Sequence, residues 1–377
     1  MDFIKDFNYS YWEIKDYFQT FDLVVIGSGI VGLSTAISFK KNNPKAKLLI
    51  LEKGIMPNGA STKNAGFACF GSPGELLDDL SKMPENSVWE TVKMRWEGLQ
   101  LLRKRLTDKH IDFRAYGSYE LYSEKKELSF CKEQIGFLNT EIKRVIGLKN
   151  CFEDRSATMN LFHNVKGAVF NSFEGQIDTA LMMKNLLALA RKNGIEILNN
   201  VDVLNITEAN EQVELKSNLG IFKAHKVVVA TNGFARSLLK IKDVKPARAQ
   251  VLITKPIKNL KIKGTFHFFK GYYYFRNIDN RILFGGGRNL DLKGETTSEQ
   301  GLNSVIQNQL DTFLKEMILP HTPFEIDHRW SGIMGVGREK KPIIRPVGKN
   351  VLAAIRMGGM GIAIGSFVGE EAAKAIS

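Results

Sequence analysis

A glycine motif placed directly after a short apolar run restricts the fold of this chain more than any other feature. Residues 22–26 read DLVVI, and residues 27–32 follow as GSGIVG, a GxGxxG pattern. A helix-like stretch over 30–41 and a second apolar run over 47–51 come next. Strand, glycine turn, helix and strand in this order predict a βαβ unit with two parallel strands.

Each glycine of the motif is needed for a different structural reason. Gly27 allows the tight turn out of the strand, Gly29 lets backbone approach a pyrophosphate, and Gly32 permits close packing of helix on strand. The first helical residues, Ile30 and Val31, then offer backbone N–H groups and the positive end of the helix dipole to the diphosphate. The motif therefore predicts dinucleotide binding.

A carboxylate at the end of the second strand supports this interpretation. Glu52 lies 20 positions after Gly32, where it can accept hydrogen bonds from both ribose hydroxyls and would repel a 2′-phosphate. Lys53, next to it, joins the candidate cofactor-binding residues. A lone glutamate at a strand end is equally often only solvated. The motif itself does not distinguish NAD from FAD.

Composition excludes several other classes of protein. Of 377 residues 44% are hydrophobic and 25% are charged, which is typical of a globular protein. Cys69, Cys131 and Cys151 form no CxxC pair and the six histidines are scattered, so we expect neither disulfides nor a metal site. The net charge of +13 is spread along the chain, which favours a solvated surface over nucleic-acid binding.

Hydropathy bears on location. No apolar run is long enough to span a bilayer, so we expect no transmembrane segment. The first residues mix acidic and aromatic side chains and show no signal-peptide core, and we therefore expect a cytoplasmic protein.

Two kinds of pattern alternate along the chain and predict two interleaved domains. The fold class we expect is α/β, with a Rossmann-type domain and a substrate domain of α+β type built on a mostly antiparallel sheet. The nucleotide-type segments are 20–105, 175–245 and 330–377, the β-rich segments are 106–174 and 246–329, and 1–19 form an N-terminal extension.

Five stretches, in this order, resemble the D-amino-acid oxidase superfamily of FAD-dependent oxidoreductases, which includes glycine oxidase, sarcosine oxidase and γ-glutamylputrescine oxidase. The first is DLVVIGSGIVGLSTAISF with the later LLILEKG. The others are GASTKNAG at 59–66, VVVATNG at 227–233, WSG at 330–332 and GGMG at 358–361. Each is loose alone, but together they cover nearly the whole chain.

The resemblance implies FAD as the cofactor and a set of residues that contact it. In that reading Ser61, Thr62 and Asn64 donate hydrogen bonds to phosphate or ribityl oxygens, whereas Ala65 and Gly66 leave room for the flavin ring. Val203 pairs its backbone with adenine. The remaining contacts come from Ala230, Thr231, Asn232 and Gly233, and from Gly358, Gly359, Met360, Gly361 and Ile362 at the start of a final helix.

The family's reaction is hydride transfer from a C–H beside nitrogen to the flavin, which implies a small amine or amino acid as substrate. The electron acceptor would be O2 or a quinone or other carrier. In the family a tyrosine of one strand covers the substrate, and alternation puts Tyr272 and Tyr274 on one face of it; packing within the sheet explains them equally well. Four arginines are candidates for binding a carboxylate: Arg276, Arg288, Arg338 and Arg356. Arg338 and Arg356 join the two tyrosines as substrate-pocket candidates. Most arginines, however, are only surface charges.

The chain departs from its relatives at informative positions. Met334 stands where glycine oxidase has a carboxylate-binding arginine, which puts a simple glycine or D-amino-acid substrate in doubt. Leu283 stands where sarcosine oxidase has an oxygen-activating lysine, and no cysteine lies in the C-terminal region. We therefore expect noncovalent FAD and slow or absent use of oxygen. Arg356 replaces the glycine that usually opens the C-terminal cluster.

Two other functions remain open. One is a flavin dehydrogenase of a 2-hydroxy acid or glycerol phosphate, because remote relatives share the scaffold, although the segment STKNAG favours the amine branch. The other is a tRNA-modifying flavoenzyme, which a charge of +13 would suit, although no separate RNA-binding module is visible.

Overall fold

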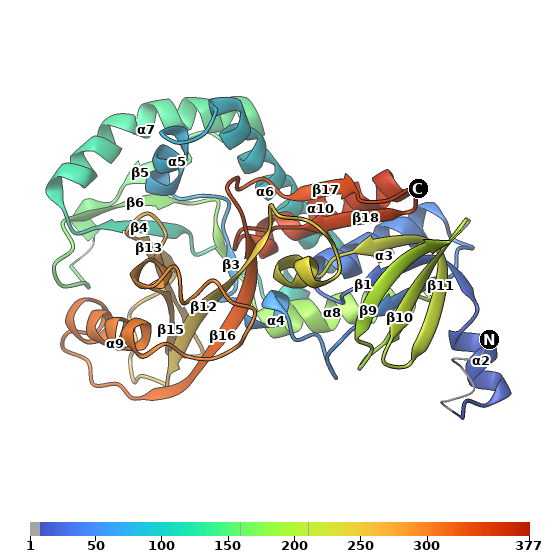
Figure 1. The fold of residues 1–377 in the computed structure, drawn as a ribbon. Helices are drawn as coiled ribbons and strands as arrows, with labels where there is room; N and C mark the ends of the chain where they lie inside the picture. The colour runs from blue at the N-terminus through green and yellow to red at the C-terminus, as the bar shows by residue number, and fades with distance from the viewer. Residues whose placement is uncertain (1–7, 159, 210) are drawn as a thin grey trace. The chain divides into compact units, whose positions relative to one another are not determined.

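The computed structural model describes residues 8–158, 160–209 and 211–377 (Figure 1). The chain divides into two compact units, each assembled from separate stretches. The first unit comprises Met1–Thr62, Ala180–Pro246 and Met334–Ser377, and the second comprises Lys63–Thr179 and Ala247–Ile333.

The first unit contains an eight-stranded sheet with a parallel centre. Its main path runs β17-β18-β11-β1-β2-β8, and every pair from β18 to β8 is parallel, whereas β17 is antiparallel to β18. A β9–β10 hairpin extends from β11. The strands are β1 (Thr20–Ile26), β2 (Leu48–Leu51), β8 (Glu196–Leu198), β9 (Val203–Ala209), β10 (Gln212–Ser217), β11 (Gly220–Val229), β17 (Ile343–Pro346) and β18 (Val351–Ile355). The Rossmann-type sheet is confirmed.

Two helices of the first unit pack unusually close to their neighbours. These are α3 (Ile30–Asn42) and α10 (Gly361–Ile376). A Cβ on Gly32 of α3 would lie 1.9 Å from the carbonyl oxygen of Gly27. A Cβ on Gly365 would lie 2.8 Å from Ile30 Cγ2, and one on Gly369 2.4 Å from Ser34 Cβ. Gly365 lies against Ile30, and Gly369, four residues later in α10, lies against Ser34, four residues later in α3. The two helices therefore run parallel. Their N-termini therefore lie at the same end of the unit, beyond the carboxyl ends of β1 and β18.

The second unit is built on another eight-stranded sheet, in the order β16-β12-β15-β14-β13-β4-β6-β5. The sheet is mostly antiparallel, as we expected, with β13 and β4 running parallel. A separate pair, β3 and β7, is antiparallel. The strands are β3 (Phe67–Ala68), β4 (Ser118–Tyr122), β5 (Phe152–Asp154), β6 (Gly167–Asn171), β7 (Gly175–Gln176), β12 (Lys245–Thr254), β13 (Thr265–Phe268), β14 (Tyr273–Ile278), β15 (Arg281–Gly286) and β16 (Ile326–Val336).

The segment 106–174, which we predicted to be β-rich, contains a helix of 22 residues, α7 (Lys125–Ile146). It buries Leu128, Cys131, Leu138 and Ile142 against α5 (Pro73–Leu80), α6 (Glu85–Leu106) and strands β4 to β6, a layer visible in Figure 1. Buried residues at 128, 131, 138 and 142 follow a helical period, so the sequence carried the signal. Other helices are α2 (Tyr11–Tyr17), α4 (Ala60–Lys63), α8 (Thr179–Lys192) and α9 (Ser304–Phe313).

The first boundary between the units also differs from our prediction. We placed residues up to 105 with the nucleotide-binding segments, but the second unit begins at Lys63 because α5 and α6 share a hydrophobic core with α7. Within the predicted extension 1–19, the residues that the structure describes contact the first unit: Tyr9 donates a hydrogen bond to the Leu219 carbonyl and Phe18 stacks on Phe222. Residues 1–7 lie outside the described part.

Among the described residues, no helix combines the length and the apolar character needed to cross a bilayer.

We predict that Gly369→Ala lowers the free energy of unfolding by about 1–3 kcal/mol, because the new methyl group overlaps Ser34 Cβ and lies 2.8 Å from Thr35 N. Gly136→Ala is the matched control: Gly136 is exposed in α7 and a Cβ there meets nothing within 4 Å. Alanine there should stabilise the helix by about 0.5–1 kcal/mol. Urea denaturation followed by circular dichroism measures both, and equal effects would contradict the close packing of α3 and α10.

Candidate functional site

The glycine loop lies where β1 ends and α3 begins. Gly27 has φ +102°, and the Ala230 N–H donates a hydrogen bond to the Ile26 carbonyl beside it. A Cβ on Gly29 would lie 2.9 Å from Ser61 Oγ, which accepts a hydrogen bond of 3.0 Å from the Ile30 N–H. The N-cap residues themselves, Gly29 of α3 and Met360 of α10, make no side-chain capping hydrogen bond, and at the start of α3 the Ile30 N–H is taken by Ser61. The two helices thus direct backbone N–H groups of their first turns toward one end of the unit, an arrangement that suits an anion.

Glu52 is held against this loop. Its Oε2 accepts hydrogen bonds from Ser28 N at 3.0 Å and Ser28 Oγ at 2.6 Å, and its Oε1 accepts one from Gly54 N at 3.0 Å. A carboxylate has about four acceptor positions, so about one remains for a ribose hydroxyl. Lys53 is 75% exposed and pairs with Asp202, a surface contact of small energetic value. Val203 opens β9 and is buried.

The segment after β11 contains a buried hydroxyl without a partner. Thr231 Oγ1 is inaccessible to solvent and makes no hydrogen bond within the described part of the chain. An unsatisfied buried polar group costs free energy, and a cofactor atom at hydrogen-bond distance would remove that cost. Asn232, at φ +48°, accepts hydrogen bonds from the N–H groups of Arg356 and Met357, and Gly233 follows it in the same turn. Gly358 and Gly359 have positive φ and lead through Met360 into Gly361 and Ile362 of α10.

The two arginines that the sequence proposed for the substrate pocket lie in different surroundings. Arg356 is buried at φ +69°, and its guanidinium donates hydrogen bonds to the carbonyls of Lys341 and Asp243 and lies 3.4 Å from the Glu339 carboxylate. Arg338 is exposed in the loop after β16. The guanidinium of Arg356 therefore holds protein oxygens, a structural role that the sequence did not signal.

In the second unit, Asn64, Ala65 and Gly66 form a tightly bound segment. Asn64 Oδ1 accepts hydrogen bonds from Gly66 N at 2.9 Å and Thr179 Oγ1 at 2.8 Å. The Arg276 Nε donates to the Ala65 carbonyl. Burial lowers the pKa of Arg276 to about 10, so its guanidinium stays charged at neutral pH. Sequence reasoning considered Arg276 only as a ligand for a substrate carboxylate and missed this contact.

Ala65 also belongs to an apolar cluster that we call the aromatic wall. It consists of Ala65, Val251 and Leu283 with Phe67, Ile253, Tyr274, Ile278 and Trp330. Burial raises the pKa of Tyr274 to about 12, so its phenol is neutral at physiological pH. Trp330 Nε1 donates a hydrogen bond of 3.0 Å to the Lys63 carbonyl, which anchors the wall to the segment before Asn64.

The three consecutive tyrosines do not share one environment. Tyr274 is in the aromatic wall, whereas Tyr273 packs in the hydrophobic core of the second unit, as alternation along a strand requires. Tyr272 precedes the first residue of β14 and is 46% exposed. The alternation that we extended to Tyr272 therefore starts one residue later.

We predict that Thr231→Val raises the dissociation constant for FAD about fivefold, because one hydrogen bond to the cofactor is lost. The apo protein should keep or gain stability, since its buried hydroxyl has no partner. Thr35→Val is the control: its hydroxyl binds the Val31 carbonyl within α3, so FAD affinity should not change. Fluorescence titration of apoprotein measures both. An unchanged affinity in Thr231→Val would show that this hydroxyl does not contact the cofactor.

The chain is similar to several known proteins over most of its length. The probable oxidoreductase OrdL of Haemophilus influenzae is 20% identical, with 94% of this chain and 82% of that protein covered. A D-amino acid dehydrogenase of Helicobacter pylori is 24% identical, with 93% of each covered. The crystal structure of L-proline dehydrogenase from P. horikoshii superimposes with a TM-score of 0.77 at 20% identity, covering 96% of this chain and 94% of that one. The model of the DAO family, described as FAD dependent oxidoreductase, matches residues 22–375, and the chain belongs to that family.

Proposed function

We propose that this protein oxidises the C–N bond of a small amino acid or amine with noncovalently bound FAD. The observation that carries the proposal is the aromatic wall, because it contains Ala65, one of the residues expected to contact the flavin, together with Tyr274. A substrate with an apolar body would fit beside this apolar cluster, and the cluster would keep water from the flavin-contacting segment.

The residues of the first unit fit FAD. Gly27 and Gly32 allow the tight turn and the close approach of α3 to it, Gly29 leaves backbone open to a diphosphate, Glu52 keeps about one acceptor position for a ribose hydroxyl, and Thr231 has an unsatisfied hydroxyl. Bound FAD supplies an acceptor for the hydride that leaves the carbon beside the substrate nitrogen. The N-terminus of α10, where the N-cap residue Met360 makes no side-chain capping hydrogen bond, would stabilise negative charge on that acceptor. All three cysteines are buried thiols of the second unit, and none lies near the C-terminus.

On the substrate side, the protein's residues bind and orient. The aromatic wall holds the apolar part and excludes water, and the neutral Tyr274 phenol can donate a hydrogen bond without adding charge. The substrate nitrogen must be uncharged so that its lone pair assists hydride loss, and an apolar surface favours that form. The resulting imine leaves and is hydrolysed by water.

Arg288 is the candidate for binding a substrate carboxylate. Arg276 and Arg356 already bind protein oxygens, and Arg338 is exposed. The Nε of Arg288 is buried and lacks a hydrogen-bond partner within the described residues, and burial lowers the pKa of its guanidinium. A substrate carboxylate would accept a hydrogen bond from that N–H and would neutralise the positive charge of the guanidinium.

The function is tested by anaerobic reduction of the bound flavin. The substrates are N-methyl, cyclic and D-amino acids, each paired with the amine that lacks the carboxylate, together with 2-hydroxy acids and glycerol 3-phosphate. We expect bleaching by an amino acid, faster than by its decarboxylated partner, with the difference lost in Arg288→Gln and kept in Arg338→Gln. Bleaching only by hydroxy acids or glycerol 3-phosphate would overturn the amine assignment. Slow recovery in air would indicate a dehydrogenase.

We predict that Tyr274→Phe lowers kcat/KM by about 3- to 10-fold, the value of one hydrogen bond to a neutral partner. Tyr273→Phe is the matched control. The ring of Tyr273 stacks on Phe268 in the core, so removal of its hydroxyl should leave kcat/KM unchanged. Since the pKa of Tyr274 is about 12, the pH profile below 10 should have the same shape in Tyr274→Phe and wild type. Equal losses in both variants would contradict a role for Tyr274 at the substrate.

A further inference from the structure

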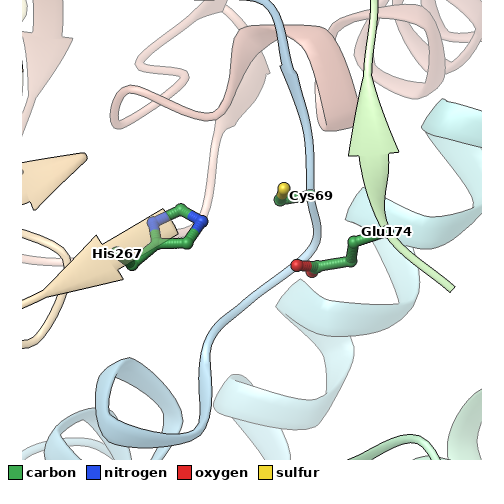
Figure 2. A group of neighbouring side chains, drawn as sticks. All are labelled: Cys69, Glu174 and His267. Carbon is green, nitrogen blue, oxygen red and sulfur yellow. The ribbon is translucent and has the colours of Figure 1, made fainter. Parts of the chain in front are cut away.

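Three side chains with different donor atoms meet inside the second unit, far apart in sequence. They are Cys69, just after β3, Glu174, just before β7, and His267 on β13 (Figure 2). One thiol, one carboxylate and one imidazole nitrogen all lie within 4.8 Å of one another. Cys69 and Glu174 are almost fully buried, whereas the His267 residue is partly exposed.

Two atoms of this cluster lack partners. Glu174 Oε2 and His267 Nε2 are both buried and make no hydrogen bond within the described part of the chain. The other carboxylate oxygen, Oε1, is held by the N–H groups of Phe70 at 2.6 Å and Gly71 at 3.0 Å. One oxygen is thus fixed by backbone while the second is left for another ligand, which is how a supporting shell orients a metal-binding carboxylate.

From this geometry we propose that Cys69, Glu174 and His267 bind a divalent transition metal, best zinc. Sulfur, nitrogen and a single carboxylate suit zinc, whereas calcium and magnesium prefer several oxygen ligands. Zinc would satisfy both partnerless atoms, and a water molecule can take the fourth position. The bond lengths of zinc to these donors put them about 3.4–3.7 Å apart in a tetrahedron, so side-chain rotation must draw them together by about 1 Å.

The protonation states of the three groups are compatible with binding. Burial lowers the pKa of His267 to about 4, so its nitrogen lone pair is free at neutral pH. Burial raises the pKa of Glu174 to about 7 and that of Cys69 well above its usual range. Zinc displaces the thiol proton to solvent as the Zn–S bond forms, and it likewise displaces any proton on Glu174.

The segments of Cys69 and Glu174 are already joined by the β3–β7 pair and by the hydrogen bonds from Phe70 and Gly71 to Glu174, and the metal would add a link from both of them to β13. Cys69 Sγ lies 3.7 Å from both the Gly175 carbonyl and Thr265 Oγ1, distances of weak sulfur hydrogen bonds. Cys69 also lies three residues after Gly66. A zinc ion there would hold the β3–β7 pair to β13 and stiffen the chain that carries Asn64, Ala65 and Gly66. The site does not depend on which substrate the flavin oxidises.

The test is metal analysis of the full-length protein, purified without a histidine tag and without added metal. After gel filtration, elemental analysis by mass spectrometry should find about one zinc ion per chain. X-ray absorption at the zinc edge should show one sulfur at about 2.3 Å and lighter donors at about 2.0–2.1 Å. If the purified protein contains no metal, one equivalent of ZnSO4 should bind and raise the unfolding temperature, whereas MgCl2 should not. Absence of zinc from the purified protein together with failure of ZnSO4 to bind would overturn the proposal.

Variants separate this site from adventitious binding to thiols. Glu174→Gln and His267→Gln, which keep nearly the same volume, should each lose most of the zinc. Cys151→Ser should retain it, because Cys151 is also a buried thiol but lies outside the cluster. Zinc retained in both glutamine variants would overturn the assignment. The absorption measurement on wild type decides the matter if either variant fails to fold.

Discussion

The close contact of α3 with β1, and of α10 with α3, is the constraint on which the cofactor site depends. Gly32 lets α3 approach the carbonyl of Gly27, and Gly365 and Gly369 let α10 lie directly on α3. Side chains at these positions would separate the three elements. Because they stay together, the N-termini of both helices reach the carboxyl ends of β1 and β18, where a dinucleotide meets a doubly wound sheet. Glu52 and Asn232 are then fixed by hydrogen bonds to the same loops.

The aromatic wall of the second unit is apolar and carries no charge. Arg276 beside it is used to hold the Ala65 carbonyl. Arg356 likewise holds carbonyls of its own unit. Two buried cations therefore support the backbone.

Much of the fold could be predicted from sequence because its signals are local. The strand at 22–26, the helix from Ile30 and the final helix from Gly361 carry their own periodicity and glycine turns, and the structure has all of them. The helix α7 was missed although its apolar residues have a helical period, because neighbouring strands dominated our interpretation of 106–174. The partners of Arg356 could not be predicted, since they depend on where the loops at 243 and 339–341 meet.

The cluster of Cys69, Glu174 and His267 shows the same limit. We expected no metal site because the cysteines and histidines show no ligand spacing, and spacing is the only signal that a sequence carries for such a site. These residues meet because β3, β7 and β13 come together in the folded unit. Successive members of this cluster lie roughly a hundred residues apart in the sequence, so the sequence alone does not show that they meet in the folded protein.

The most direct test of the account is to identify the cofactor of the purified protein. An absorption spectrum is recorded, the protein is denatured and filtered, and the released compound is measured by mass spectrometry. The account predicts one FAD per chain, all of it in the filtrate, because no cysteine is positioned at the C-terminal segment to tether it. Protein without flavin that fails to take up added FAD, or that binds NAD in its place, would contradict it.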